Sequence, residues 1–273
     1  MSSENRAAAG VDVGTECVKA IVVDASGGVI GRSVVFTRGY FEACVHEALA
    51  AALDDAQARE QDLAGVCATG FAASCVPQAT TTATETACHA RGAFRHHPSA
   101  MTVINIGGRD PRVIQVDDAG RRLEALAVRR CAVGIGTFLM FTARHLDVHP
   151  TRLQELAAAA ERPAPISSFC SVFSGTEILE RLRDGASREE IALGSMHSIA
   201  ERILEIGGFK EPLVVTGGVP EYFPGVIRAL ESQSGMKVTM VSQPLFAGAL
   251  GAALKALEEA AAGGAASGGT HER

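Results

Sequence analysis

The sequence contains no tryptophan, few other aromatic residues and no excess of basic charge. Aromatic residues make up 5% of its 273 residues, the net charge is −6 and the isoelectric point is near 5.8. An acidic chain of this kind gives a nucleic-acid partner no electrostatic attraction. Its length and its 47% of hydrophobic residues are typical of a globular protein, in one large or two modest domains.

Long apolar runs are also missing. The hydrophobic stretches are short and interrupted, well below the ~20 residues that a membrane-spanning helix requires. Residues 1–9 contain a single positive charge, Arg6, and no apolar segment, so we expect no secretory signal. These absences predict a cytoplasmic protein.

The cysteines do not follow the pattern of a disulfide-stabilised protein. Their number is odd and they are widely scattered, which argues against a disulfide framework. The seven are Cys17, Cys44, Cys67, Cys75, Cys88, Cys131 and Cys170. Each, taken alone, is typical of a small buried hydrophobic residue, and Cys88 with its neighbour His89 is expected to pack inside a helix.

The order of predicted elements repeats along the chain. In the first half we expect strands at residues 7–12, 17–24, 29–37 and 63–68, with helices at 41–60 and 82–94. In the second half we expect strands at 101–106, 112–116, 123–128, 213–216 and 237–241, with helices at 136–146, 151–161, 187–207, 222–233 and 245–259. Hairpins join the first three strands of each half, which disfavours an all-parallel Rossmann sheet. The repeat predicts an α/β fold of two related domains built on mixed sheets.

The predicted domains follow the repeat. The first covers residues 8–100 and the second, which carries Cys131 and Cys170, covers 101–244, while the helix at 245–259 is expected to pack back on the first. Residues 260–273 are mostly Ala, Gly and Ser, a composition that favours a flexible tail.

Residues 10–15 (GVDVGT) and 105–110 (NIGGRD) each have the composition of a phosphate-binding hairpin, so this motif occurs twice in the chain. Glycines have no Cβ atom, so backbone N–H groups can approach phosphate oxygens closely. A carboxylate at the strand end can hold Mg²⁺, usually through water. A third glycine turn, at residues 216–218 (TGG), follows a short apolar run. Glycine also ends many strands that bind nothing, but three such turns in this order favour a nucleotide held by two similar domains.

The hairpins and the turn supply the candidate nucleotide-binding residues. In the first hairpin Asp12 is the carboxylate, Gly14 the point of closest approach, and Thr15 a hydroxyl donor. In the second, a carboxylate at Asp110 lies close to the glycines. The full set is Gly10, Asp12, Gly14, Thr15, Lys19, Gly107, Gly108, Thr216, Gly217 and Gly218.

Cys131 and Cys170 each precede a predicted helix. A thiolate at a helix N-terminus is stabilised by unpaired N–H groups, and such groups also donate to the sulfides of iron–sulfur clusters. Two thiolates are too few for a [4Fe–4S] cluster, which takes four, but a symmetric dimer would bring two pairs together. From spacing alone, buried structural cysteines stay the alternative.

Together these motifs resemble the BadF/BadG/BcrA/BcrD ATPase family, the activators of 2-hydroxyacyl-CoA dehydratases and the ATPase subunits of benzoyl-CoA reductases. The resemblance spans roughly residues 9–257. Besides the hairpins and the turn, it rests on residues 68–70 (ATG), 85–92 (ETACHARG), 131–139 (CAVGIGTFL), 166–173 (ISSFCSVF) and 248–253 (GALGAA). The two cysteine segments are specific to this family, whereas the nucleotide motifs are shared across the actin/hexokinase-like superfamily.

The resemblance implies an actin-like, two-domain ATPase that uses ATP/ADP with Mg²⁺ and forms a dimer. One [4Fe–4S] cluster would bridge the subunits, with Cys131 and Cys170 at the ligand positions. Ferredoxin or flavodoxin would supply an electron. ATP binding and hydrolysis would then move the helices beside the cluster and drive the electron into an acyl-CoA reductase or dehydratase component.

Some positions depart from the family pattern. Asn105 replaces the usual Asp and cannot supply the same charge to Mg²⁺, and Arg109 replaces a common Gln. Residues 128–130 (VRR) stand where Asn-Asp-Lys is usual, and an acid is missing at Gly175. The cysteines are thus intact while the hydrolytic apparatus is altered. With the catalytic positions at Asp12, Asn105 and Asp110, we expect a weak ATPase that is one half of a heterodimer; a homodimer stays open.

Two functions of other classes stay open. A small-molecule kinase of the same fold, of the amino-sugar type, would use Asp110 as its base and would have no use for Cys131 and Cys170. A non-catalytic nucleotide sensor or scaffold would show neither ATP turnover nor a brown chromophore.

Overall fold

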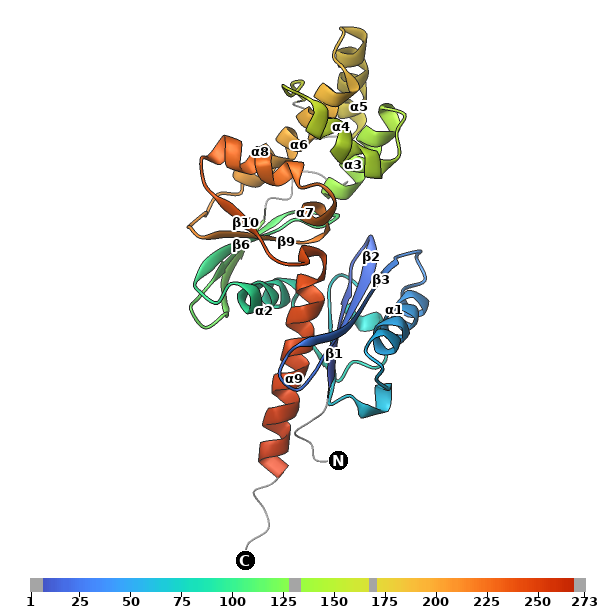
Figure 1. Ribbon diagram of the computed structural model, residues 1–273, viewed down its shortest axis with the longest axis vertical. Coiled ribbons are helices and arrows are strands. Elements are labelled where there is room, and N and C mark those ends of the chain that lie inside the picture. Colours follow the sequence, from blue (N-terminus) through green and yellow to red (C-terminus); the bar gives the residue numbers. More distant parts are fainter. Residues whose placement is uncertain (1–6, 128–133, 167–170, 268–273) are drawn as a thin grey trace, which may run out of the picture. The chain divides into compact units, whose positions relative to one another are not determined.

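The computed structural model describes residues 7–127, 134–166 and 171–267 (Figure 1). The chain divides into two compact units. Unit 1 consists of Met1–Ser99, Ala119–Arg122 and Phe246–Arg273, and unit 2 of Ala100–Asp118 and Leu123–Leu245. Cys131 and Cys170 lie outside the described residues. Within the described ranges, no helix has both the length and the apolar character needed to cross a bilayer.

Unit 1 is built on a five-stranded mixed sheet in the order β3-β2-β1-β4-β5. The strands are β1 (Ala8–Val13), β2 (Cys17–Val23), β3 (Val29–Phe36), β4 (Val66–Thr69) and β5 (Thr81–Thr82). The first three pair antiparallel through hairpins, and β4 joins β1 in parallel. The prediction of hairpins in place of crossover helices is therefore confirmed for this half.

Helices cover both faces of this sheet: α1 (Phe41–Asp55), α2 (Glu85–His96) and α9 (Ala247–Ser267). Side chains alternate along a strand. Accordingly, Ala20 and Val22 of β2 face the core under α1, while Ile21 and Val23 join the core shared with α2 and α9. This double burial explains why β1 and β2 are apolar apart from Asp12 and Lys19.

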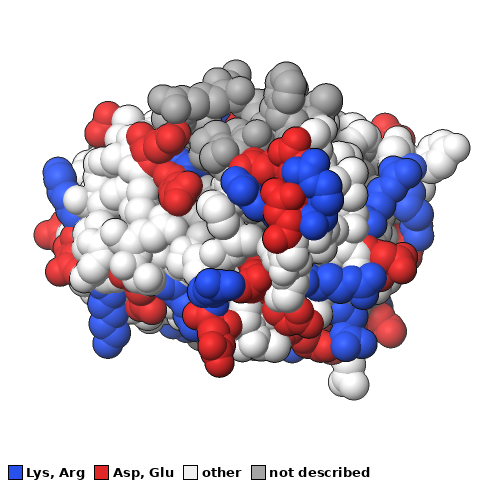
Figure 2. Space-filling view, turned by 90° about the horizontal axis from the view of Figure 1, so that it is seen from above, with Lys and Arg blue, Asp and Glu red and all other residues white. Residues whose placement is uncertain are grey.

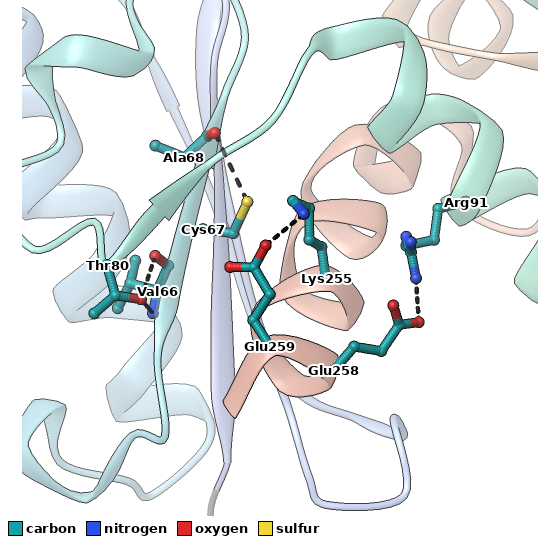
Figure 3. A network of polar contacts seen from close by, with 8 residues as sticks. All are labelled: Val66, Cys67, Ala68, Thr80, Arg91, Lys255, Glu258 and Glu259. Carbon is teal, nitrogen blue, oxygen red and sulfur yellow. Dashed lines mark hydrogen bonds and ion pairs between the residues drawn. The ribbon is translucent and has the colours of Figure 1, made fainter. Parts of the chain in front are cut away.

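Helix α9 approaches β1 and α2 closely because glycines leave no side chain in between. A Cβ atom added to Gly10 would lie 2.1 Å from the Ala249 carbonyl oxygen of α9. A Cβ atom added to Gly92 of α2 would lie 1.9 Å from the Ala247 carbonyl oxygen. One added to Gly251 of α9 would lie 1.9 Å from the Cys88 carbonyl oxygen. Outside this tight seam, Lys255 pairs with Glu259 at 2.5 Å and Arg91 with Glu258 (Figure 3). Such exposed pairs add little stability.

Unit 2 repeats this topology. Its sheet has the order β10-β9-β6-β7-β8, so β6 takes the central place that β1 has in unit 1. The strands are β6 (Met101–Asn105), β7 (Arg112–Val116), β8 (Arg122–Leu126), β9 (Leu213–Thr216) and β10 (Val238–Met240). β6 pairs antiparallel with β7 and parallel with β9. The predicted α/β fold of two similar mixed-sheet units is confirmed.

The α-helices of unit 2 among the described residues are α3 (Gly134–His145), α4 (Leu153–Ala159), α5 (Ser171–Arg183), α6 (Arg188–Leu204), α7 (Gly218–Tyr222) and α8 (Gly225–Ser234). A capping box of Ser187 and Glu190 starts α6 and satisfies two backbone N–H groups there. Acidic and basic side chains are interspersed on the face shown in Figure 2, in keeping with a chain that has no basic patch for nucleic acid on that face.

Several element boundaries differ from those predicted. The helix expected at 41–60 ends at Asp55, where Gln57 takes a positive φ of 51°. The helix expected at 222–233 starts later, at Gly225 after Pro224, and ends at Ser234 as α8, while the short helix α7 precedes it. Helix α9 extends to Ser267 instead of ending at 259, because its alanine run is strongly helix-forming.

Gly10→Ala is expected to destabilise the protein by about 1–3 kcal/mol, since the methyl group would overlap the backbone of α9. The matched control is Gly107→Ala, because nothing lies within 4 Å of a Cβ atom at that position. Urea unfolding followed by circular dichroism measures both free energies. Equal midpoints for the two variants would contradict the close-packing account.

Candidate nucleotide-binding site

The first predicted hairpin forms a tight turn between β1 and β2. The Gly14 N–H donates to the Cys17 carbonyl oxygen at 3.1 Å, and the Thr37 hydroxyl donates to the Gly14 carbonyl oxygen at 3.1 Å. A Cβ atom on Gly14 would lie 3.0 Å from that Cys17 oxygen, which leaves little room for any side chain. Thr15 is half-buried at the tip of the turn. The turn is thus a compact, backbone-lined element.

Below the turn, Asp12 and Lys19 form a buried ion pair. They lie opposite each other on β1 and β2, with Lys19 Nζ 2.8 Å from Asp12 Oδ2. Asp12 is 4% exposed and Lys19 is 7% exposed. Burial alone would lower the pKa of Lys19, but the Asp12 carboxylate, with Cys17 and Glu85, outweighs it and raises that pKa. Lys19 therefore stays charged and neutralises Asp12.

Glycines surround the Asp12 carboxylate on two further sides. Gly70, which follows β4 with a φ of 92°, would place a Cβ atom 2.5 Å from Asp12 Oδ1. Gly248 of α9 would place one 2.9 Å from Asp12 Oδ2 and 3.0 Å from His89 Nε2. Both glycines lie in motifs that carry the family resemblance, and here they leave the space that the carboxylate fills.

Gly10 has a different place from the rest of its hairpin. It is buried in the middle of β1, beneath α9, rather than at the turn. The close packing of α9 accounts for its lack of a side chain. Of the five candidates in this hairpin, Gly14 and Thr15 belong to the turn itself, and Asp12 and Lys19 lie directly below it.

The second hairpin opens from β6 in unit 2. Asn105 is buried at the end of that strand, and Gly107 faces open space. Gly108 contacts the first turn of α3: its carbonyl oxygen accepts from the Gly136 N–H at 2.9 Å. Asp110 is half-buried beyond the glycines. The loop is therefore open on one side and joined to α3 on the other.

The third turn lies beside the second hairpin. Thr216, at the end of β9, is in register with Asn105 of β6, and the Ile106 N–H donates to the Thr216 carbonyl oxygen at 2.8 Å. Gly217 has a φ of 103°, and a Cβ atom there would lie 2.7 Å from Asn105 Oδ1. Gly218 starts the short helix α7. Unit 2 thus brings two of the three predicted turns together at one sheet edge.

The two units share this arrangement residue by residue. In unit 1, Asp12 is in register with Thr69, and Gly70 follows Thr69 in the chain. In unit 2, Asn105 is in register with Thr216, and Gly217 follows Thr216. Asp12 therefore corresponds to Asn105. Gly70 and Gly217 both have a positive φ and both lean against the carboxylate or amide side chain. The sequence repeat pairs the hairpins but not the Thr-Gly turns, so it misses Thr69 and Gly70 as site residues.

His89 has neighbours that its sequence pattern, typical of a packing residue in a helix, does not indicate. It is indeed buried on α2, at 3% exposure, but its Nε2 atom and the Asp12 carboxylate both border the space that Gly248 leaves free. Burial lowers the pKa of His89, although the Asp12 and Glu85 carboxylates act in the opposite direction. The imidazole is therefore neutral near pH 7.

Each unit by itself offers oxygen atoms of the type that Mg²⁺ takes as ligands, usually with water. Unit 1 offers the Asp12 carboxylate and the Thr15 hydroxyl, and unit 2 offers the Asn105 amide. Among the described residues there is no group of three His, Cys, Asp or Glu side chains that would hold a metal ion without further ligands. Cys131 and Cys170 lie outside the described residues, so the structure gives no geometry for them.

Comparison with known proteins gives a match over most of the chain. Residues 9–256 match the BadF/BadG/BcrA/BcrD ATPase family. The activator of lactoyl-CoA dehydratase from Anaerotignum propionicum is 34% identical over 254 residues, which cover 92% of this chain and 97% of that protein. A benzoyl-CoA reductase subunit from Thauera aromatica is 29% identical over 259 residues, covering 90% and 91%.

Solved structures agree with the sequence match. The activator of the 2-hydroxyisocaproyl-CoA dehydratase from Clostridium difficile, with bound ADPNP, superposes with a TM-score of 0.86 at 27% identity. The superposition covers 95% of this chain and 97% of that one. The expected actin/hexokinase-like ATPase fold is thereby confirmed.

Lys19→Met is expected to destabilise the protein by about 3–5 kcal/mol, since it leaves the Asp12 carboxylate buried without its cation. The double variant Asp12→Asn/Lys19→Met, which has no buried charge at this pair, is expected to recover part of that loss. Chemical unfolding of the wild type, both single variants and the double variant measures the coupling. Additive losses would show that the two side chains do not stabilise each other.

Proposed function

Because the chain belongs to the BadF/BadG/BcrA/BcrD ATPase family, we propose that it is an ATP-dependent activator that passes a low-potential electron to an acyl-CoA dehydratase or reductase component. The activator of lactoyl-CoA dehydratase and the benzoyl-CoA reductase subunit match over at least nine-tenths of this chain, which supports both kinds of acceptor. The higher identity to the activator, 34% against 29%, favours a 2-hydroxyacyl-CoA dehydratase as the acceptor.

One contact carries this proposal: the junction between the glycine loop of unit 2 and α3. The Gly136 N–H donates to the Gly108 carbonyl oxygen at 2.9 Å, and a Cβ atom on Gly136 would lie only 3.0 Å from Gly108 Cα. Helix α3 begins three residues after Cys131. A loop that shifts when it binds or releases a phosphate would therefore displace the helix next to that cysteine.

The helices that follow the two cysteines are also joined to each other. Gly175 of α5 leaves space for the Phe141 ring of α3, which would lie 2.8 Å from a Cβ atom there, and for His145 Nε2 at 3.0 Å. The Phe141 and His145 rings contact each other with centroids 4.2 Å apart. The acid missing at Gly175 is thus replaced by ring packing, and α3 and α5 are held as one block.

In this proposal Cys131 and Cys170 would hold a [4Fe–4S] cluster shared with the same two cysteines of a second subunit. Such a cluster takes four thiolates and supplies one-electron transfer when bound. A two-fold axis brings two pairs together, in a homodimer or in a heterodimer of similar chains. A ferredoxin or flavodoxin would be the electron donor, and the cytoplasm the compartment.

The nucleotide would be ATP or ADP with Mg²⁺. In unit 1 the Thr15 hydroxyl at the tip of the turn would donate to phosphate, with Asp12 below it as the carboxylate for Mg²⁺ or its water. In unit 2 the open glycine at 107 offers the same access, but Asn105 gives no second negative charge. We propose slow hydrolysis for this reason.

A small-molecule kinase with Asp110 as its base is the weaker alternative. Sugar kinases share the fold alone, at 16% identity for a ROK family glucokinase. A kinase function would not explain why the glycine loop is joined to the helix that follows Cys131 in the sequence.

Cys131→Ala is expected to abolish the iron–sulfur EPR signal of protein purified without oxygen, while MgATP turnover stays measurable. Cys170→Ala is expected to do the same, and Cys75→Ala, at a half-buried cysteine of unit 1, serves as the control with an unchanged signal. EPR, iron content and phosphate release are the measurements. A wild type that lacks any iron–sulfur signal but phosphorylates a sugar would overturn the activator function in favour of a kinase.

A further inference from the structure

His89 has an environment that packing alone does not explain. It lies on the inward side of α2 and is 3% exposed, yet its Nδ1 atom has no hydrogen-bond partner among the described residues. Burying a polar nitrogen without a partner costs free energy that an apolar side chain of similar size would not cost. A histidine at this position therefore has another use to offset that cost.

The other ring nitrogen of His89 and the Asp12 carboxylate both lie next to Gly248. His89 Nε2 and Asp12 Oδ2 both lie within 3.0 Å of one point, the place that a Cβ atom on Gly248 would occupy. Because Gly248 has no side chain, nothing from α9 separates the imidazole from the carboxylate at that point. Any other residue at 248 would close this opening.

The backbone around His89 keeps the imidazole in place. Gly92 of α2 and Gly251 of α9 let the two helices approach to backbone contact on either side of His89. Three charged groups act on the ring: Asp12 from β1, Lys19 from β2 and Glu85 from the first turn of α2. Of these three groups, Asp12 is the one whose carboxylate borders, together with His89 Nε2, the space that Gly248 leaves free.

We propose that His89 is a positioning residue for Asp12, acting on Oδ2 through the opening at Gly248. A carboxylate is only an acceptor, so the interaction requires the proton of the imidazole on Nε2, leaving Nδ1 as the bare nitrogen. Lys19 Nζ contacts the same oxygen, at 2.8 Å. Lys19 and His89 together fix Oδ2, so that Oδ1, on the Gly70 side, keeps a single orientation. This inference rests on the proposed nucleotide-binding function of Asp12.

Outer partners of this kind typically contribute 10–100-fold to metal affinity or activity. We therefore expect His89→Ala to lower kcat for MgATP hydrolysis about 10-fold or more, with a smaller change in KM, and to weaken MgADP binding in calorimetry. His89→Gln places an amide N–H near the Nε2 position and is expected to restore part of both. His89→Asn, whose amide is too short to reach, is expected to restore neither. His96→Gln, at an exposed position of the same helix, is the matched control and is expected to behave as the wild type.

A double-variant cycle separates positioning from packing. Gly248→Ala closes the opening and is expected to lose as much activity as His89→Ala. The variant His89→Ala/Gly248→Ala is expected to lose less than the sum of the two single losses, because both changes remove the same interaction and the missing imidazole relieves one of the two close contacts of the methyl group. Circular dichroism and the unfolding midpoint show that each variant is folded.

The outcomes are distinguishable. Equal kcat and MgADP affinity in folded His89→Ala and wild type would overturn the positioning role while leaving the nucleotide function intact. So would additive losses in the double variant, or a His89→Gln variant no better than His89→Asn. A wild type that binds no MgADP would overturn the nucleotide function and this inference together.

Discussion

The close contact of α9 with β1 and α2 is the constraint on which the site of unit 1 depends. Three glycines, Gly10, Gly92 and Gly251, let the backbone of α9 lie against β1 and α2 at three points of this seam. Interiors packed this tightly do not deform gradually. The seam therefore holds Gly248 in place, and with it the space that Asp12 and His89 border.

Unit 2 has the same sheet edge with different surroundings. Its Thr-Gly turn and its strand-end side chain match those of unit 1, but Asn105 is neutral where Asp12 is charged. The glycine loop is instead joined by a backbone hydrogen bond to the helix that follows Cys131. The two units thus share one arrangement of strands and turns. In the proposed mechanism the first unit holds the charge, and the second transmits a change in the loop to α3.

The sequence was sufficient for the fold because its elements depend on local patterns. Hairpin turns such as residues 25–28, apolar strands and the capping box at Ser187 each act within a few residues, and the duplicated order of strands followed from them. The predicted helix boundaries were wrong where a single residue ends or begins a helix, as at Gln57 and Pro224. The two-residue strand β5 was missed since Thr81–Thr82 is too short to produce a pattern.

The site was less predictable, for a physical reason. Asp12 and Lys19 are seven residues apart, and the hairpin brings them opposite each other, so their proximity follows from register. His89, Gly70 and Gly248 reach the same carboxylate from three other elements, and only the tertiary packing of α2 and α9 brings them there. An amphipathic pattern assigns His89 to the core, which is correct for its burial but says nothing about which atom it faces. A buried histidine becomes informative only when the packing places it and a charged group beside the same helix glycine.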